Sequence, residues 1–372
     1  MKTNFVKLRW LFTMLLFVTT MIMPTMMLAK SIDLKIPEGD GAGTPYKIGT
    51  AEELYWFAGL VNGTLPGVKK DLSANAILTD DIIVNTGVLD PNKDLVSGND
   101  FIEWIPIGKS SSDDDAYTGT FDGNGHTISG LYFNKSNSWY VGLFGCIGAE
   151  GKISNVGVSD SYFQSSNCPY IGGVCGSNSG ELQNCSNSST VIGKENEYRI
   201  GGVCGYNSGT IKNCYNTASV SGQYSVGGVC GDNYEGPITN CYYLSGTVAD
   251  GKGGIGGKDD ENGKAVEMSK DRFKSGEVAW LLNGSKSVST EESTLAWYQK
   301  LGENADAYPV LKSTDHNTVY KAPLFSCDGT TRIGEYANKP EGDKLSHNYQ
   351  MAEKADEGTS NLYSEECAIC HN

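Results

Sequence analysis

Four residues near the C-terminus have the types and spacing of a metal site. Cys327, His347, Cys367 and Cys370 lie in a polar tail that ends Cys-Ala-Ile-Cys-His-Asn. Cysteine thiolates and a histidine nitrogen are the usual ligands of tetrahedral zinc, and Cys367 and Cys370 have the spacing of a zinc knuckle. These four residues are therefore the candidate metal ligands of the chain.

The same tail also matches C-x-x-C-H, the attachment signature of c-type haem. In that interpretation His371 would be one axial ligand and Met351 or His347 the other. Only Asn372 follows the signature, and no apolar helices follow it to enclose a porphyrin. We therefore expect no haem and at most one zinc ion, with plain thiols or a disulfide as the simpler alternative.

Four ionisable residues in the Gly-rich middle of the chain could cleave glycans if the fold brought them together: Asp122, His126, Arg199 and Asp232. General acid–base catalysis needs a titratable pair held in one place. These residues do not recur at equivalent positions of the repeat described next. No catalytic residue is therefore predicted, and glycan cleavage remains the alternative function.

The segment that would position these groups repeats one pattern three times. Each copy reads Gly-Gly-Val-Cys-Gly followed by Asn-Cys, and the copies are 29 and then 26 to 27 residues apart. A repeat of this length is one supersecondary unit that packs on its neighbours. The repeat is defined by Gly172, Gly173, Cys175 and Cys185, by Gly201, Gly202, Cys204 and Cys214, and by Gly227, Gly228, Cys230 and Cys241.

The repeat pattern predicts short strands. Its apolar stretches are brief and are separated by Gly, Asn and Ser, which favour tight turns. Strand and turn at a fixed period describe one coil of a parallel β-helix, and such coils stack about 4.8 Å apart so that equivalent side chains form ladders. Cysteines 175, 204 and 230 would form one buried column and cysteines 185, 214 and 241 another. Neighbouring thiols would be close enough for a disulfide, which the sequence neither requires nor excludes.

The repeat resembles the GLUG motif, a Gly-rich repeat of bacterial secreted and surface proteins. Residues 140–156 resemble a degenerate copy, and residues 117–130 resemble the opening coil of such solenoids. The resemblance implies an all-β fold, a right-handed parallel β-helix with small α/β capping segments at both ends. Some bacterial immunoglobulin-A peptidases carry this motif, but none of the four histidines here is followed by the Glu of their H-E-x-x-H zinc helix. The resemblance therefore implies the fold and no particular activity.

Six segments are expected along the chain: a signal peptide at 1–29, an N-terminal capping segment at 30–116, the β-helix at 117–250, a flexible Gly-rich linker at 251–265, a C-terminal α/β capping segment at 266–325 and the Cys/His-containing tail at 326–372. Basic residues, a long apolar run and Ala29 favour a cleaved leader, with an uncleaved anchor as the alternative. Thr50 begins a capping box for a helix that ends at Gly63, and a second helix is expected from Ser269 to Gly284.

Charge excludes two classes of partner. A net charge of −15 opposes binding to nucleic acid and to anionic membranes. Residues 161–250 contain few charges and many Ser, Asn, Gly and Tyr, and repeat stacks present broad binding faces. We therefore expect a non-catalytic, adhesin-like binding or structural module, secreted or on the cell surface or outer envelope, that binds a cell-surface or matrix glycan or protein and has no membrane span once the leader is removed. The alternative is a polysaccharide lyase or hydrolase built on a β-helix.

Overall fold

A computed structural model describes most of the chain between residues 32 and 367. The described ranges are 32–110, 114–167, 169–194, 199–249, 252–256, 264–285, 295–325, 332–338, 349–352 and 364–367. The expected signal peptide lies outside them. So do Cys327, His347 and Cys370 of the expected zinc set.

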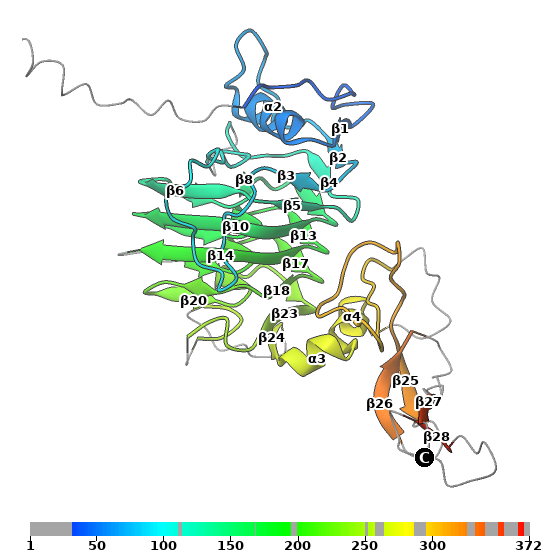
Figure 1. Ribbon diagram of the computed structural model, residues 1–372. Coiled ribbons are helices and arrows are strands. Elements are labelled where there is room, and N and C mark those ends of the chain that lie inside the picture. Colours follow the sequence, from blue (N-terminus) through cyan, green and yellow to red (C-terminus); the bar gives the residue numbers. More distant parts are fainter. Residues whose placement is uncertain are drawn as a thin grey trace, which may run out of the picture. The chain divides into compact units, whose positions relative to one another are not determined.

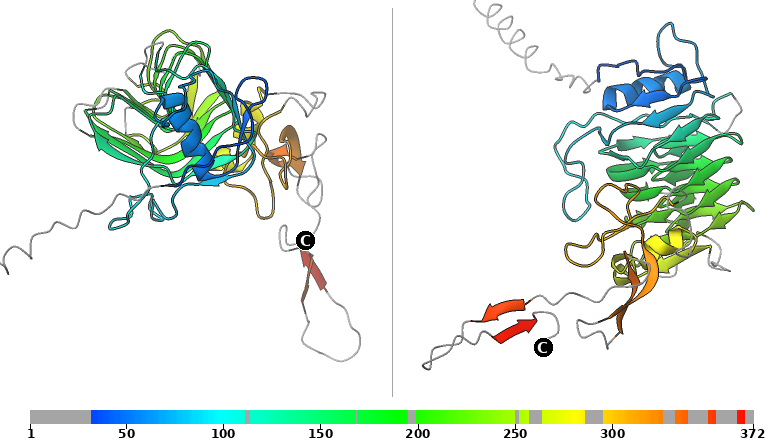
Figure 2. Two further views of the ribbon diagram at one scale, coloured as in Figure 1. Left: turned by 90° about the horizontal axis from the view of Figure 1, so that it is seen from above. Right: turned by 90° about the vertical axis from the view of Figure 1, so that its right-hand side faces the viewer.

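Parallel strands stack into a β-solenoid of about seven turns, so the predicted fold class is confirmed (Figure 1). Seen along the stack, successive coils superimpose (Figure 2). The seven-stranded sheet has the order β1 (Tyr46–Ile48), β2 (Ala76–Leu78), β4 (Thr120–Asp122), β9 (Lys152–Ser154), β13 (Glu181–Gln183), β17 (Thr210–Lys212) and β22 (Ile238–Thr239). The nine-stranded sheet has the order β24 (Ala265–Met268), β23 (Cys241–Leu244), β18 (Tyr215–Asn216), β14 (Ser186–Lys194), β10 (Gly157–Ser166), β5 (Thr127–Ser129) and β3 (Ile82–Ile83), with β6 (Tyr132–Ser136) and β19 (Val220–Ser221) beside it.

Two four-stranded sheets complete the coils, and we name each after its prominent side chains. The tyrosine sheet contains β7 (Tyr140–Val141), β11 (Tyr170–Gly172), β15 (Arg199–Gly201) and β20 (Ser225–Gly227). The cysteine sheet contains β8 (Phe144–Ile147), β12 (Cys175–Asn178), β16 (Cys204–Asn207) and β21 (Cys230–Asn233).

The cysteine columns form in the predicted register. Cys175 lies opposite Cys204, and Cys204 opposite Cys230. Val174 and Cys175 are both fully buried, although neighbouring strand residues normally face opposite sides. A bend between β11 and β12 interrupts the alternation, so both side chains reach the core.

Close packing explains the paired glycines of the repeat. A Cβ at Gly172, Gly201 or Gly227 would lie 2.0–2.2 Å from a backbone oxygen of the cysteine that follows in the same repeat. A Cβ at Gly202 would lie 2.2 Å from the carbonyl oxygen of Gly228 in the next coil. These glycines are therefore needed because the coils leave no room for a side chain at these positions.

Left-handed backbone occurs at a different corner from the one expected. The sequence suggested positive φ in the Gly- and Asn-containing segments 176–180, 205–209 and 231–236, but of these residues only Glu235 has it, with φ of 61°. Left-handed backbone recurs instead at the asparagines before the second cysteine of each repeat, Asn184, Asn213 and Asn240, with φ between 51° and 54°. Asparagine tolerates this region better than other residues with a side chain, which explains its recurrence there.

The first capping helix follows its sequence signals. Helix α2 (Ala51–Asn62) begins after Thr50, whose side chain accepts a hydrogen bond from the Glu53 backbone N–H, and ends at Gly63 with φ of 64°. Its buried face joins the core of the coils and the helix covers one end of the stack (Figure 2). The stack itself extends further than expected, because β1, β2 and β3 pair with later coils.

The second cap departs from its prediction. Two short helices, α3 (Lys270–Lys274) and α4 (Glu277–Leu282), replace the single expected helix, because Gly276 has φ of 88° and breaks it. Part of the expected linker belongs to a further turn of the solenoid. The backbone N–H groups of Gly228 and Val229 donate to the carbonyl oxygens of Gly253 and Gly254, and β24 pairs with β23. Two antiparallel hairpins follow, β25 (Tyr320–Phe325) with β26 (Arg332–Ala337) and β27 (Tyr349–Ala352) with β28 (Ser364–Cys367).

Candidate binding sites

The cysteines of the repeat are structural. Cysteines 146, 175, 185, 204, 214, 230 and 241 are buried free thiols, so the columns contain no disulfide. Burial raises the pKa of Cys146 to about 11 and raises the pKa of Cys204 and Cys230 above the ordinary value. A buried, protonated thiol neither attacks nor binds metal readily, so the column of Cys175, Cys204 and Cys230 serves packing.

Asparagine side chains of the coils are also buried, and they form hydrogen bonds from one coil to the next. The Asn178 amide donates to the Asn207 Oδ1 at 2.8 Å, and Asn207 donates to Asn233 at 2.7 Å. Asn187 donates to Asn216 at 2.9 Å, and both side chains are fully buried. These amides therefore hold the coils together and do not offer the ligand contacts that the sequence suggested.

One outward column of the tyrosine sheet carries large polar side chains. Tyr140 pairs with Tyr170, Tyr170 with Arg199, and Arg199 with Ser225. The Tyr140 and Tyr170 rings stack with centroids 5.0 Å apart and an interplanar angle of 4°. In-register parallel pairing produces this stack, because equivalent positions of neighbouring coils point the same way.

An adjoining column extends this group into the cysteine sheet, where Tyr206 pairs with Asp232. The Arg199 guanidinium lies 5.3 Å from the Tyr170 ring centroid and 5.2 Å from that of Tyr206. Its Nε donates to the Asp232 carboxylate at 2.8 Å. We call Tyr140, Tyr170, Arg199, Tyr206 and Asp232 the tyrosine–arginine ladder.

The electrostatics of this ladder are nearly balanced. Partial burial alone would lower the pKa of Arg199, but the hydrogen bond to Asp232 raises it, so the guanidinium stays charged. Partial burial and the Asp232 carboxylate raise the pKa of Tyr206, so its phenol stays protonated. Trp139 precedes the ladder along the chain and Tyr234 follows it; their side chains are 65% and 64% exposed. Exposed Tyr and Trp are enriched where proteins bind partners.

The four candidates for glycan cleavage separate into two places. Arg199 and Asp232 form an ion pair in the ladder. Asp122 lies in the seven-stranded sheet, where its Oδ1 accepts from the Asn124 backbone N–H at 2.8 Å and from the Asn155 amide at 3.0 Å. His126 follows in the same turn, with Nδ1 3.4 Å from the Asp81 carboxylate. The structure therefore pairs Arg199 with Asp232 and places Asp122 and His126 elsewhere, at the end of β4 and in the turn that follows it.

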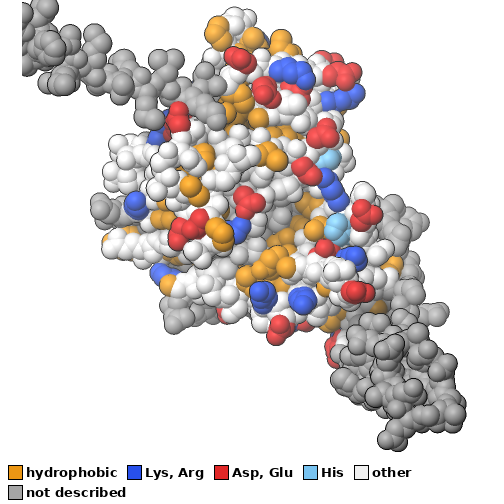
Figure 3. Space-filling view, viewed as in Figure 1, with side chains coloured by type: hydrophobic (Ala, Val, Ile, Leu, Met, Phe, Trp, Pro, Cys, Tyr) orange, Lys and Arg blue, Asp and Glu red, His pale blue; other side chains and the backbone are white. Residues whose placement is uncertain are grey.

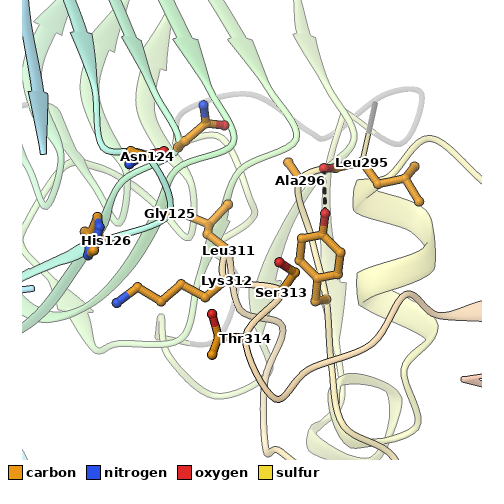
Figure 4. A pocket seen from close by; sticks show the side chains of 11 residues that line it. Asn124, Gly125, His126, Leu295, Ala296, Leu311, Lys312, Ser313 and Thr314 are labelled. Carbon is orange, nitrogen blue, oxygen red and sulfur yellow. Dashed lines mark hydrogen bonds between the residues drawn. The ribbon is translucent and has the colours of Figure 1, made fainter. Parts of the chain in front are cut away.

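Sequence reasoning missed two adjacent hollows between the coils and the C-terminal cap. The first has a volume of about 390 Å³ and the second about 290 Å³, and both contain Gly125, Leu311 and Lys312 in their walls. Figure 4 shows the first, with His126 on the side of the coils, the Lys312 side chain of the cap extending toward it, and Leu295 and Ala296 of the cap on the opposite side. The residues come from segments about 180 residues apart, so no local sequence signal could have united them.

One ion pair joins the two walls of these hollows. The Lys312 Nζ of the cap lies 2.6 Å from the Asp81 carboxylate of the coils, whereas His316 Nε2 lies 3.4 Å from Asp306 within the cap. Burial opposes ionisation of Asp81, but the hydrogen bond from Lys312 lowers its pKa. Acidic, basic and His side chains lie close together on this face (Figure 3).

Neither a metal cluster nor a membrane-spanning helix occurs in the described ranges. No group of three or more His, Cys, Asp or Glu there could hold a metal ion. The expected zinc set remains a prediction, because three of its members lie outside the described residues and of Cys367 only the backbone in β28 is described. No described helix is long and apolar enough to cross a membrane.

Comparison with known proteins identifies the repeat. The GLUG motif matches residues 196–221. An 84-residue stretch, 23% of this chain, is 38% identical to Halomucin of Haloquadratum walsbyi, and a 78-residue stretch, 21% of the chain, is 33% identical to a Gly-rich protein of Evansella cellulosilytica provisionally named a membrane protein. The chain spans only 1% and 9% of the length of these relatives.

A solved structure from Bacteroides ovatus, provisionally named an immunoglobulin A1 protease, also resembles the chain. It is 18% identical with a TM-score of 0.39, and the match covers 73% of this chain and 93% of that one. A likeness this remote does not bear on function. The motif match and the stacked coils together show that the protein is a β-solenoid built on the GLUG repeat.

Proposed function

We propose that the protein is an exported, non-catalytic, adhesin-like module of the cell surface that binds a surface or matrix glycan or protein. One observation carries this proposal: the tyrosine–arginine ladder, which places aromatic and cationic groups in register on the outside of the stack. The ladder has the features of a recognition surface and lacks those of a catalytic one.

Recognition is favoured because the ladder is rigid and amphipathic. Tyr and Arg side chains are over-represented at binding hot spots, where a ring supplies contact area and a polar tip supplies hydrogen bonds. The β-sheet backbone fixes the ladder before a ligand arrives, so little conformational entropy is lost on binding. The ion pair between Arg199 and Asp232 balances the local charge. We therefore expect binding that depends weakly on salt.

Catalysis is not expected at the ladder. A general base needs a pKa near the working pH. The pKa of Tyr206 is raised, and the Asp232 carboxylate is held by Arg199. Tyr206 is therefore protonated near neutral pH, and the Asp232 carboxylate is occupied by Arg199.

Export is supported by the sequence and by one relative. The basic, apolar leader favours secretion. The provisional name of the Evansella relative assigns that protein to a membrane. Both agree with a surface location for this chain.

A binding screen tests the proposal. Purified protein is applied to immobilised matrix proteins and to acidic and neutral surface polysaccharides, and the best ligand is titrated against Tyr170→Ala, Tyr170→Phe and the matched control Tyr132→Ala. Tyr132 stacks on Tyr162 with centroids 6.4 Å apart, but in the nine-stranded sheet. We expect Tyr170→Ala to weaken binding at least about tenfold, as loss of a hot-spot side chain does, and Tyr132→Ala to leave it unchanged.

Two results would overturn the proposal. One is a folded Tyr170→Ala variant that binds as well as the wild type. The other is release of reducing ends from a polysaccharide, lost on changing Asp122, His126 or Asp232 to Ala, which would establish the glycan-cleaving alternative.

A further inference from the structure

We propose that the second hollow between the coils and the C-terminal cap is a separate binding site for a neutral, hydroxyl-rich ligand of one or two sugar units. Its floor is the outer face of β5, β10, β14 and β18, and its roof is the cap segment at residues 309–312. The tyrosine–arginine ladder lies on other sheets. The two sites would therefore act independently.

A missing side chain creates the central notch of the floor. Thr127, Gly157, Ser186 and Tyr215 occupy equivalent positions in four successive coils. A Cβ at Gly157 would lie 3.0 Å from the Thr127 hydroxyl oxygen and 3.2 Å from that of Ser186. Gly157 therefore opens a gap flanked by two hydroxyls, in a column where the other coils have side chains.

Hydroxyl groups without protein partners line this notch. Ser159 and Ser188 are opposite one another in β10 and β14 and are half-buried beside Thr127. In the portion of the chain with described positions, the hydroxyls of Thr127, Ser159 and Ser188 donate no hydrogen bond to protein. Each hydroxyl can both donate and accept, which suits the hydroxyls of a sugar.

The walls supply an apolar contact and no net charge. Val310 and Leu311 of the cap are half-buried and line the hollow, and the buried rings of Trp297 and Tyr215 close one end with centroids 5.1 Å apart. Lys312 lines the other end, where Asp81 compensates its charge at 2.6 Å. An apolar wall beside uncharged hydroxyls favours a neutral ligand with both apolar and hydroxyl faces, as a pyranose has.

Volume limits the size of this ligand. The hollow measures about 290 Å³, at the lower end of ligand pockets, which are roughly 300–1,000 Å³. The adjacent hollow of about 390 Å³ shares Gly125, Leu311 and Lys312 with it. A single ring would occupy the second hollow, and a second ring would reach toward the first.

Ligand-observed NMR with four probes tests this site: glucose, galactose, N-acetylglucosamine and cellobiose, each at millimolar concentration. We expect saturation transfer from the wild-type protein to at least one probe. Gly157→Ala should abolish it by filling the notch, because the flanking hydroxyls can rotate aside and the backbone has ordinary φ. Gly43→Ala is the matched control, since its Cβ would meet only Asp40 at 3.6 Å.

Two further variants keep the result interpretable. The double variant Ser159→Ala/Ser188→Ala removes hydroxyls without adding volume and should weaken binding about fivefold or more if each donates one hydrogen bond. Tyr170→Ala should leave probe binding intact, so failure of the ladder proposal would not affect this result. The proposal is overturned if the wild type gives no saturation transfer to any probe, or if folded Gly157→Ala and the serine double variant bind like the wild type.

Discussion

At the scale of the residue, the solenoid is specified by repeated positions where close packing allows only one type of side chain. Paired glycines allow neighbouring backbones to approach, cysteines fill the space inside each coil, and asparagines link the coils through their amides. Each repeated residue thus has a structural reason to recur. The residues proposed to bind a partner lie outside this repeated set.

The buried thiols should be chemically inert in the folded protein. Cys175, Cys204 and Cys230 are fully buried, and burial raises their pKa, so little thiolate is present at neutral pH. We expect alkylation by iodoacetamide, mapped by peptide mass spectrometry, to modify them only after unfolding in guanidinium. Equal labelling of Cys204 before and after unfolding would show that the column is open.

Gly202→Ala should destabilise the solenoid strongly. The new Cβ would meet the Gly228 carbonyl oxygen of the neighbouring coil at 2.2 Å and the Asn216 side chain of its own coil at 2.3 Å. Overpacking of a tight core costs about 1–3 kcal/mol, and here a backbone atom must move. Chemical denaturation measures the loss, with Gly253→Ala as control because its Cβ would meet only the Ile255 oxygen, at 3.9 Å. Equal stability of the two variants would contradict this account of the glycines.

At the scale of the element, corners and caps set the length and direction of each strand. The asparagine column joins consecutive corners: Asn184 donates to Asn155 at 2.9 Å, Asn213 to Asn184 at 3.2 Å and Asn240 to Asn213 at 3.2 Å. At each of these corners, a backbone with positive φ and a hydrogen bond between asparagine side chains both contribute to stability. Two substitutions can separate these contributions.

Asn213→Gly should lose only the side-chain hydrogen bonds to Asn184 and Asn240. Asn213→Ala should lose these hydrogen bonds and also strain the backbone. Asn213 has φ of 54°, which glycine adopts freely and alanine does not. We expect Asn213→Ala to lower the free energy of unfolding by about 1 kcal/mol more than Asn213→Gly. Thermal and chemical denaturation compare the pair, and a Gly variant less stable than the Ala variant would contradict the corner assignment.

The link between α3 and α4 should make the cap sensitive to acid. Two Arg272 nitrogens contact the Glu277 carboxylate at 2.7 Å and 2.6 Å, and these hydrogen bonds lower its pKa from the ordinary 4.5. A depressed pKa means that the ionised form stabilises the fold above about pH 4.5, and that this contribution is lost as pH falls through the lower folded value. Glu277→Gln should therefore be less stable than the wild type at pH 7, with the difference shrinking toward pH 3. A pH-independent difference in melting temperature would contradict this role.

Sequence patterns predicted the structural features that depend on short local motifs or on the repeat spacing. The capping box at Thr50, the stop at Gly63 and the cysteine register follow from short motifs and fixed spacing. The break at Gly276 was missed because an isolated glycine inside a helical pattern is often tolerated. The tyrosine–arginine ladder was only partly predictable, because Tyr170 and Arg199 share a register position that becomes visible once the coils are aligned.

The hollows could not be predicted at all. Asp81, His126 and Lys312 meet only because the cap returns over coils formed much earlier in the chain. No periodicity relates residues of a cap to residues of a coil. The two hollows were therefore found from the structure alone.

At the scale of the whole molecule, one stack supports two different surfaces. The tyrosine and cysteine sheets carry the ladder, and the nine-stranded sheet forms the floor of the second hollow. Because every coil is hydrogen-bonded to the next, neither surface needs to fold when a ligand arrives. This rigidity is the physical basis of the proposed binding function.

The most direct test of that function is a calorimetric titration of the best ligand from the screen into wild-type protein and the Arg199→Ala/Tyr170→Ala variant, with the ligand recovered afterwards for mass spectrometry. The account predicts saturable binding by the wild type, at least about tenfold weaker binding by the variant, little change between low and moderate salt, and a ligand recovered intact. Equal affinity of the two folded proteins, or recovery of a cleaved ligand, would contradict it.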